Sequence, residues 1–244
     1  MTRIHRSLAI SVLILVACTG ELQAQHEGDV FVGRTAGGQL KIGGFIPDLN
    51  IVVLPPVSSP PGLFNGWSDN NPGFDRVTTD DIENDLLTLQ SGVQVRIEVV
   101  EVDPAFQTIS TSFVIIDEPG ERILLGNENL HTHLIWLINS DLVGQFDALQ
   151  VLWRATFRLV DTGNTGYAAS DPFTFYFANV ACLRGDMSGD GETNGADVQA
   201  FIETVVDPAS ATEEARCAAD TNQDGFATVD DVASFVEAVL GAGA

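Results

Sequence analysis

Alternating apolar and polar positions predict short β-strands over the first two thirds of the chain. In residues 149–160, one face carries Leu149, Val151, Trp153, Ala155, Phe157 and Leu159, and the other carries Gln150, Arg154, Thr156 and Arg158. This alternation is typical of a strand with one buried face and one wet face. Similar segments lie at 29–34, 39–43, 51–54, 93–102, 112–116, 123–125, 130–138 and 173–180. Many short strands separated by turn residues predict a β-sandwich or jelly roll over residues 25–181.

Two segments of this region depart from the alternation. Residues 80–89 have the pattern of a helix, and residues 55–74, rich in Pro, Gly, Asn and Asp, predict a long loop. Phe64, Trp67 and Phe74 lie in or beside that loop. If exposed, these aromatic side chains would stack on sugar rings, which makes polysaccharide one possible partner; if buried, they would pack the loop onto the sheet.

A helical period appears twice near the C-terminus. Val198, Phe201, Ile202, Val205 and Val206 recur 34 positions later as Val232, Phe235, Val236, Val239 and Leu240. The spacing i, i+3, i+4, i+7, i+8 predicts one apolar stripe on each helix. Because neither helix can bury its stripe alone, we expect the two helices to pack together. Pro208 predicts the end of the first helix and Gly241 the cap of the second.

An acidic loop of 12 residues precedes each of these helices. Oxygen-bearing side chains occupy positions 1, 3, 5, 9 and 12, and Gly occupies position 6. The first set is Asp186, Ser188, Asp190, Asn194 and Asp197, with the backbone carbonyl of Glu192 at position 7; the second is Asp220, Asn222, Asp224, Thr228 and Asp231, with the carbonyl of Phe226. Ca²⁺ takes six to eight hard oxygen ligands, and Gly at position 6 permits the sharp turn. The spacing therefore predicts two Ca²⁺ sites.

The duplicated unit resembles a known family of docking modules. Residues 182–185 are too short to form the helix that precedes the loop in a full EF-hand, so each unit reads as a loop followed by a helix. Two such units over residues 182–244 resemble the type I dockerin family. That resemblance implies a small α-helical, calcium-dependent domain that binds a cohesin-like protein, often in extracellular assemblies that degrade polysaccharide.

The charge balance narrows the class of partner further. The chain has 34 acidic and 11 basic residues and a formal net charge of −23. A nucleic-acid partner is excluded on this ground, because too few basic side chains exist to displace counterions from phosphates. Cations are the natural partners. The chain also contains no G-x-S-x-G, P-loop or CxxC motif, so the sequence favours a non-catalytic protein.

Residues 1–24 have the pattern of a bacterial export signal. A short basic start precedes an apolar run over residues 8–17, which is too short to span a bilayer. Cleavage after Ala24 would release a secreted protein without a transmembrane segment. The residues up to Cys18 also resemble a lipoprotein signal, in which lipid on Cys18 would tether the protein at the cell surface. Both routes place the mature chain outside the cytoplasm.

Export also bears on the remaining cysteines and on the histidines. Cys182 and Cys217 form an even pair in an oxidising compartment, so we predict a disulfide between them. His131 and His133 share one face of a strand and would chelate Zn²⁺ or Cu²⁺ if His26, near the new N-terminus, supplied a third ligand. Such a site would suit an extracellular metal-dependent enzyme acting on polysaccharide. The alternative is that the two strand histidines are hydrogen-bonded sheet residues without a metal.

Overall fold

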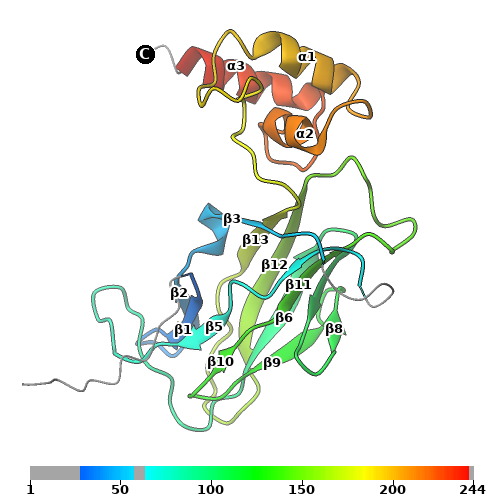
Figure 1. Ribbon diagram of the computed structural model, residues 1–244. Helices are drawn as coiled ribbons and strands as arrows, with labels where there is room; N and C mark the ends of the chain where they lie inside the picture. The colour runs from blue at the N-terminus through cyan, green and yellow to red at the C-terminus, as the bar shows by residue number, and fades with distance from the viewer. Residues whose placement is uncertain (1–27, 58–63, 242–244) are drawn as a thin grey trace, which may run out of the picture.

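The computed structural model describes residues 28–57 and 64–241 and is mainly β, with helices only after residue 197 apart from one short 3-10 turn (Figure 1). The strands are β1 (Val30–Arg34), β2 (Leu40–Gly44), β3 (Ile51–Val53), β4 (Gly66–Asp69), β5 (Phe74–Arg76), β6 (Val95–Val102), β7 (Phe106–Ile109), β8 (Ile115–Ile116), β9 (Arg122–Gly126), β10 (His131–Thr132), β11 (Ile135–Asn139), β12 (Leu152–Asp161) and β13 (Phe173–Ala178). The helices are α1 (Val198–Val206), α2 (Glu213–Ala219) and α3 (Val232–Gly241), with 3-10 turns η1 (Pro47–Leu49) and η2 (Val229–Asp231). None of the helices in these two ranges has the length and apolar character that a bilayer crossing requires.

The strands form three sheets with the orders β10-β5-β1-β2, β4-β11-β7-β8 and β3-β13-β12-β6-β9. Aromatic side chains from all three sheets meet in one core. The ring centroid of Trp136 on β11 lies 5.0 Å from that of Phe175 and 5.3 Å from that of Phe177, both on β13. Phe106 on β7 stacks on Phe177 at 4.5 Å, and Phe74 on β5 meets Phe175 at 6.3 Å. The side chains of the third sheet therefore pack against those of the other two sheets.

The alternation expected over residues 149–160 is confirmed from Val151 onward; β12 begins at Leu152, and Gln150, expected on the wet face, is buried. Val151, Trp153, Ala155, Phe157 and Leu159 are all fully buried, and the arginines of the opposite face are exposed. β12 lies between β13 and β6, and both pairings are antiparallel. The segments expected at residues 29–34 and 39–43 are also present, as β1 and β2, and they pair as an antiparallel hairpin.

The helix expected at residues 80–89 is wrong. These residues form turns, because aspartate side chains take up the backbone donors that a helix would use. The amide of Thr88 donates to Oδ1 of Asp80 at 2.8 Å, and the amide of Asn84 donates to Oδ1 of Asp81 at 3.1 Å. Local side-chain hydrogen bonds have therefore overridden the apolar spacing.

The long loop expected at residues 55–74 is wrong in part, because it contains β4 and the first residue of β5. β4 pairs antiparallel with β11, and β5 pairs parallel with β1. The strand β7 was also missed, and the strand expected at 130–138 divides into β10 and β11. Short strands depend on their partners more than on their own composition, so turn-forming residues concealed them.

The two C-terminal helices pack together as expected. The rings of Phe201 on α1 and Phe235 on α3 stack with centroids 3.9 Å apart and planes 2° from parallel. The predicted disulfide between Cys182 and Cys217 is present and joins the starts of the two units. In a chain-entropy model, closing a loop of this size stabilises the fold by about 3–4 kcal/mol.

The apolar stripes of α1 and α3 are buried only along one row. Phe201 and Phe235 are buried and Val205 and Val239 pack partly against them. A second row on each helix faces outward, with side chains between 38% and 74% exposed: Val198, Ile202 and Val206 on α1, and Val232, Val236 and Leu240 on α3. The stacked phenylalanines already fill the space between the helices, so the outer row has no partner within the described residues.

Helix α2 corrects the expectation that each unit is only a loop followed by a helix. Thr212 caps α2, since its side-chain oxygen accepts from the amide of Ala215 at 3.2 Å. Because α2 runs directly into the second acidic loop, that loop is flanked by α2 and α3, as in a full EF-hand. The cap residue followed by acidic residues was a signal of this helix that the apolar pattern obscured.

Candidate functional site

The first acidic loop is organised around two inward carboxylates. Asp186, at position 1, accepts hydrogen bonds from the amides of Gly189, Asp190 and Gly191 at 2.7, 3.1 and 2.8 Å. At position 12, Asp197 accepts from the amides of Ser188 and Asn194, both at 2.8 Å. The backbone is therefore wrapped about the first and last carboxylates of the loop.

The second loop repeats this arrangement. Asp220 accepts from the amides of Asp224 at 3.0 Å and Gly225 at 3.3 Å. Asp231 accepts from the amides of Asn222 at 3.0 Å and Thr228 at 2.8 Å. The amides of positions 3, 5, 6 and 9 thus make equivalent contacts in both loops, and only the bond from the amide of Gly189, at position 4, has no counterpart among the described residues of the second loop.

Position 5 has the same role in each loop. The amide of Glu192 donates to Oδ1 of Asp190 at 2.9 Å, and the amide of Phe226 donates to Oδ1 of Asp224 at 3.0 Å. These bonds hold the backbone of position 7, whose carbonyl is a predicted ligand. The donor set of each loop, carboxylates with hydroxyl, amide and carbonyl oxygens, fits Ca²⁺ and offers no soft ligand.

Burial sets the electrostatics of these carboxylates. Asp197, Asp220 and Asp231 are fully buried. Loss of hydration raises the pKa of Asp220 to about 6; Arg184 opposes this rise and Asp231 adds to it. Burial likewise raises the pKa of Asp231, against hydrogen bonds from two backbone amides. At Asp197 burial works in the same direction, but hydrogen bonds led by that from Asn194 outweigh it and leave the pKa lowered. A divalent cation would relieve the repulsion in the second loop.

The two loops differ in their surroundings. Nη1 of Arg184 donates to Oδ2 of Asp220 at 3.1 Å and to the backbone carbonyl of Asp220 at 2.6 Å. The guanidinium group of Arg184 therefore contacts the first carboxylate of the second loop. Loop 1 is mostly open to solvent, whereas Gly225 in loop 2 is buried. The carbonyl oxygen of Gly225 accepts a hydrogen bond from the amide of Val151, so loop 2 also contacts the β region.

A separate group of candidate ligands lies on the first sheet. One ligand atom from each of Asp29, His131 and His133 falls within 4.8 Å of the others. The structure thus brings together the two histidines that the sequence singled out, whereas His26 lies outside the described residues. Asp29 was missed, because it reaches the histidines only through the pairing of β1 with β5 and of β5 with β10.

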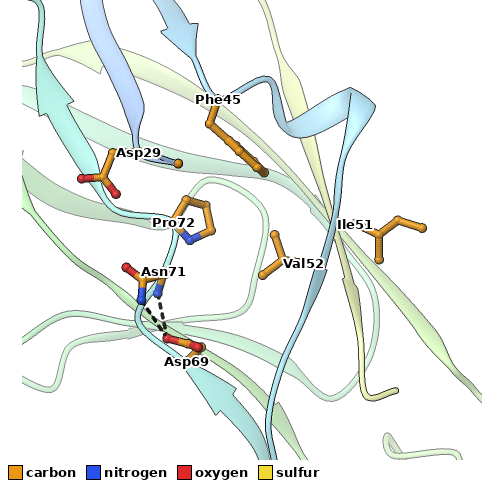
Figure 2. Close-up of a pocket in the computed structure, with 8 residues that line it drawn as sticks. Asp29, Phe45, Ile51, Val52, Asp69, Asn71 and Pro72 are labelled. Carbon is orange, nitrogen blue, oxygen red and sulfur yellow. Dashed lines mark hydrogen bonds between the residues drawn. The ribbon is translucent and has the colours of Figure 1, made fainter. Parts of the chain in front are cut away.

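A pocket of about 420 Å³ adjoins this group (Figure 2). Its lining includes Asp29, Phe45, Val52 and Pro72. The carboxylate of Asp29 is turned away from Phe45 and Val52 in Figure 2. Polar and apolar groups therefore lie on different sides of the pocket.

The aromatic residues considered for sugar stacking are largely occupied within the protein. Phe74 is fully buried. Trp67 is half-buried and stacks on Phe146 with ring centroids 6.0 Å apart. These contacts favour packing over sugar binding for both side chains.

The chain has no match among protein-family models or curated proteins. The residues that bear on function are those of the two acidic loops and of the Asp29, His131 and His133 group.

Proposed function

We propose that this chain is an exported, calcium-binding interaction protein. Residues 182–244 would act as a dockerin-like module that attaches the β region, a β-sandwich over residues 25–181, to a cohesin-like or other extracellular protein. The observation that carries this proposal is the matched geometry of the two acidic loops. In both, amides of positions 3 and 9 bind the carboxylate of position 12 at 2.8–3.0 Å.

Calcium would act in this protein by ordering the module. In the second loop, burial raises the pKa of Asp220 and of Asp231, so the desolvation and mutual repulsion of these carboxylates oppose folding. A bound Ca²⁺ ion offsets both costs, so its binding free energy becomes folding free energy. The small core around Phe201 and Phe235 supplies little stability without this contribution.

The outward rows of α1 and α3 support docking to another protein. Ile202 and Val236, at equivalent places in the two units, are 52% and 46% exposed. Exposed apolar side chains at equivalent places on two helices are suited to contact with another protein. The strongly acidic chain disfavours a nucleic-acid or anionic-membrane partner.

Contacts between facing sheets support the proposed β-sandwich. Trp136 and Phe106 in the second sheet contact Phe177 in the third. Side chains of facing sheets that meet in one core are characteristic of sandwiches. No catalytic role is needed to explain this core.

Calorimetric titration of the full chain with Ca²⁺ tests the proposal. We expect two bound ions, and a lower thermal midpoint of the helical circular dichroism in excess chelator. Asp186→Ala and Asp220→Ala should each remove one site, and Asp207→Ala, an acidic change outside both loops, should retain two. Two native-affinity sites in both loop variants, or the same thermal midpoint with and without chelator, would falsify the assignment.

Export needs its own measurement. The mass and N-terminal sequence of the protein recovered from bacterial cells distinguish cleavage after Ala24 from lipidation of Cys18. Recovery of the full-length chain from the cytoplasm would contradict both routes.

A further inference from the structure

We propose that Asp29, His131 and His133 form a binding site for one divalent transition-metal ion, with Zn²⁺ as the probe. This site goes beyond the proposed calcium-dependent docking, because it lies in the β region and uses different ligand chemistry. Two imidazole nitrogens and one carboxylate oxygen suit Zn²⁺ and neighbouring transition metals, and a water molecule would complete the coordination.

The hydrogen bonding of His133 prepares it as a ligand. Its Nδ1 lies 2.9 Å from the backbone carbonyl oxygen of Asn70. Because a carbonyl oxygen only accepts, Nδ1 donates to it, and a metal ion would bind the ring through Nε2. That Nε2 lies 4.0 Å from Oδ2 of Asp29. A backbone carbonyl that fixes the ring of a metal-binding histidine is a common outer contact of such sites.

Asp29 supplies an independent indication of a ligand. Its side chain is only 3% exposed. Oδ1 accepts from the amide of Gly73 at 2.9 Å, but Oδ2 has no hydrogen-bond partner among the described residues. A buried carboxylate oxygen without a donor is costly, and coordination of a cation would satisfy it.

His131 completes the group from the neighbouring strand. It lies opposite Asp75 in the pairing of β10 with β5, and its Nδ1 is 3.8 Å from Oδ2 of Asp75. The rings of His131 and His133 are 5.4 Å apart. A tetrahedral zinc ion with bonds of about 2.0–2.1 Å separates its ligand atoms by about 3.4 Å. The ligand atoms within 4.8 Å therefore need only a small inward movement.

The backbone around the group leaves space for this arrangement and little else. A Cβ atom placed on Gly73 would lie 2.6 Å from the ring of His133, so only glycine permits the ring to occupy its position. The same residue donates its amide to Asp29. Gly73 thus holds the carboxylate and admits the imidazole at once.

The site is spatially separate from the acidic loops. Figure 1 shows β1, β5 and β10 at the end of the β region that lies away from the three helices. Zn²⁺ binding can therefore be measured with both loops saturated by Ca²⁺. A failure of zinc binding would leave the calcium proposal untouched, and the reverse also holds.

The test is calorimetric titration of the untagged full chain with Zn²⁺ in excess Ca²⁺. We expect one zinc ion per chain. Asp29→Asn and His133→Gln should each weaken zinc binding by tenfold or more, whereas Asp171→Asn, an exposed carboxylate change elsewhere in the β region, should not alter it. Zinc should also raise the thermal midpoint of the native chain and not that of Asp29→Asn.

Two further measurements guard against misfolded variants. Co²⁺ in place of Zn²⁺ should produce the visible absorption of a four-coordinate ion, and the ring resonances of His131 and His133 should shift on zinc addition to the native chain. Gly73→Ala should weaken zinc binding although it removes no ligand. Absence of zinc binding by the native chain, or native affinity in a folded Asp29→Asn, would overturn the proposal.

Discussion

The backbone amide of Val151, just before β12, donates to the carbonyl oxygen of Gly225 at 2.9 Å. Gly225 is the sixth residue of the second acidic loop, so a predicted calcium loop is hydrogen-bonded to the residue that immediately precedes β12. Nη2 of Arg216 adds a second contact, to the carbonyl oxygen of Ala148 at 3.1 Å. The helical module is therefore attached to the sheet through its second loop and through α2.

This contact predicts that the two equivalent loop glycines differ in their tolerance of a side chain. A Cβ on Gly225 would lie 2.6 Å from the carbonyl oxygen of Leu152, whereas a Cβ on Gly191 would meet nothing within 4 Å. Both residues have positive φ, +100° and +88°, so backbone strain is common to the two substitutions. We expect Gly225→Ala to lower the free energy of unfolding by about 1–3 kcal/mol more than Gly191→Ala. Urea unfolding of both variants measures the difference, and equal losses would contradict the contact.

Asp220 predicts how metal-free stability depends on pH. Burial, opposed by Arg184, raises its pKa from 3.8 to about 6 in the folded chain. Between these values the folded state binds more protons than the unfolded state, so the free energy of unfolding falls as pH rises from about 4 to about 6. Thermal midpoints of the helical signal in chelator should therefore decrease over that window.

The matched control for this pH effect is Asp220→Asn, which cannot titrate at that position. We expect its midpoint to change less between pH 4 and pH 6 than that of the native chain, if chelator is present for both. An identical slope in the variant would assign the pH dependence to other groups. With Ca²⁺ present the direction should reverse, because the ion binds the ionised carboxylate.

The disulfide should matter most when calcium is absent. Cys182 and Cys217 are 35 positions apart, and they close the loop that carries the first proposed calcium site. Replacing both by Ser should lower the free energy of unfolding of the module by about 3–4 kcal/mol. The circular dichroism of the double Ser variant should show an unfolded module in chelator and a folded module in excess Ca²⁺. A variant as stable as the native chain in chelator would refute this role.

Glu98 is the charged residue on which the third sheet depends most clearly. Its side chain is buried on β6 between Arg122 on β9 and Arg158 on β12, and Nε of Arg158 donates to it at 2.6 Å. Glu98→Gln leaves both guanidinium groups without their anion and should cost about 1–3 kcal/mol of unfolding free energy. The control is Glu101→Gln, an exposed change on the same strand, which we expect to stay within about 0.5 kcal/mol. Chemical denaturation of both variants, followed by tryptophan fluorescence, provides the comparison.

Features that depend on neighbours in the chain were predictable. Periodicity predicted the buried face of β12, the strands β1 and β2, and the packing of α1 on α3. The even number of cysteines predicted the disulfide. The errors came where side chains compete with the backbone or where a partner strand decides. Asp80 and Asp81 converted an expected helix into turns, and β4 exists because β11 pairs with it.

The sequence alone determined the two 12-residue loops. All predicted ligands of each calcium ion lie within one loop, so the spacing of residues along the chain sets the geometry. Only the tertiary structure decided that Asp29 meets His131 and His133, which follow it by more than a hundred positions. Parallel pairing of β1 with β5 and antiparallel pairing of β5 with β10 create that proximity. Contacts across a sheet depend on register between distant segments, and no local pattern encodes that register.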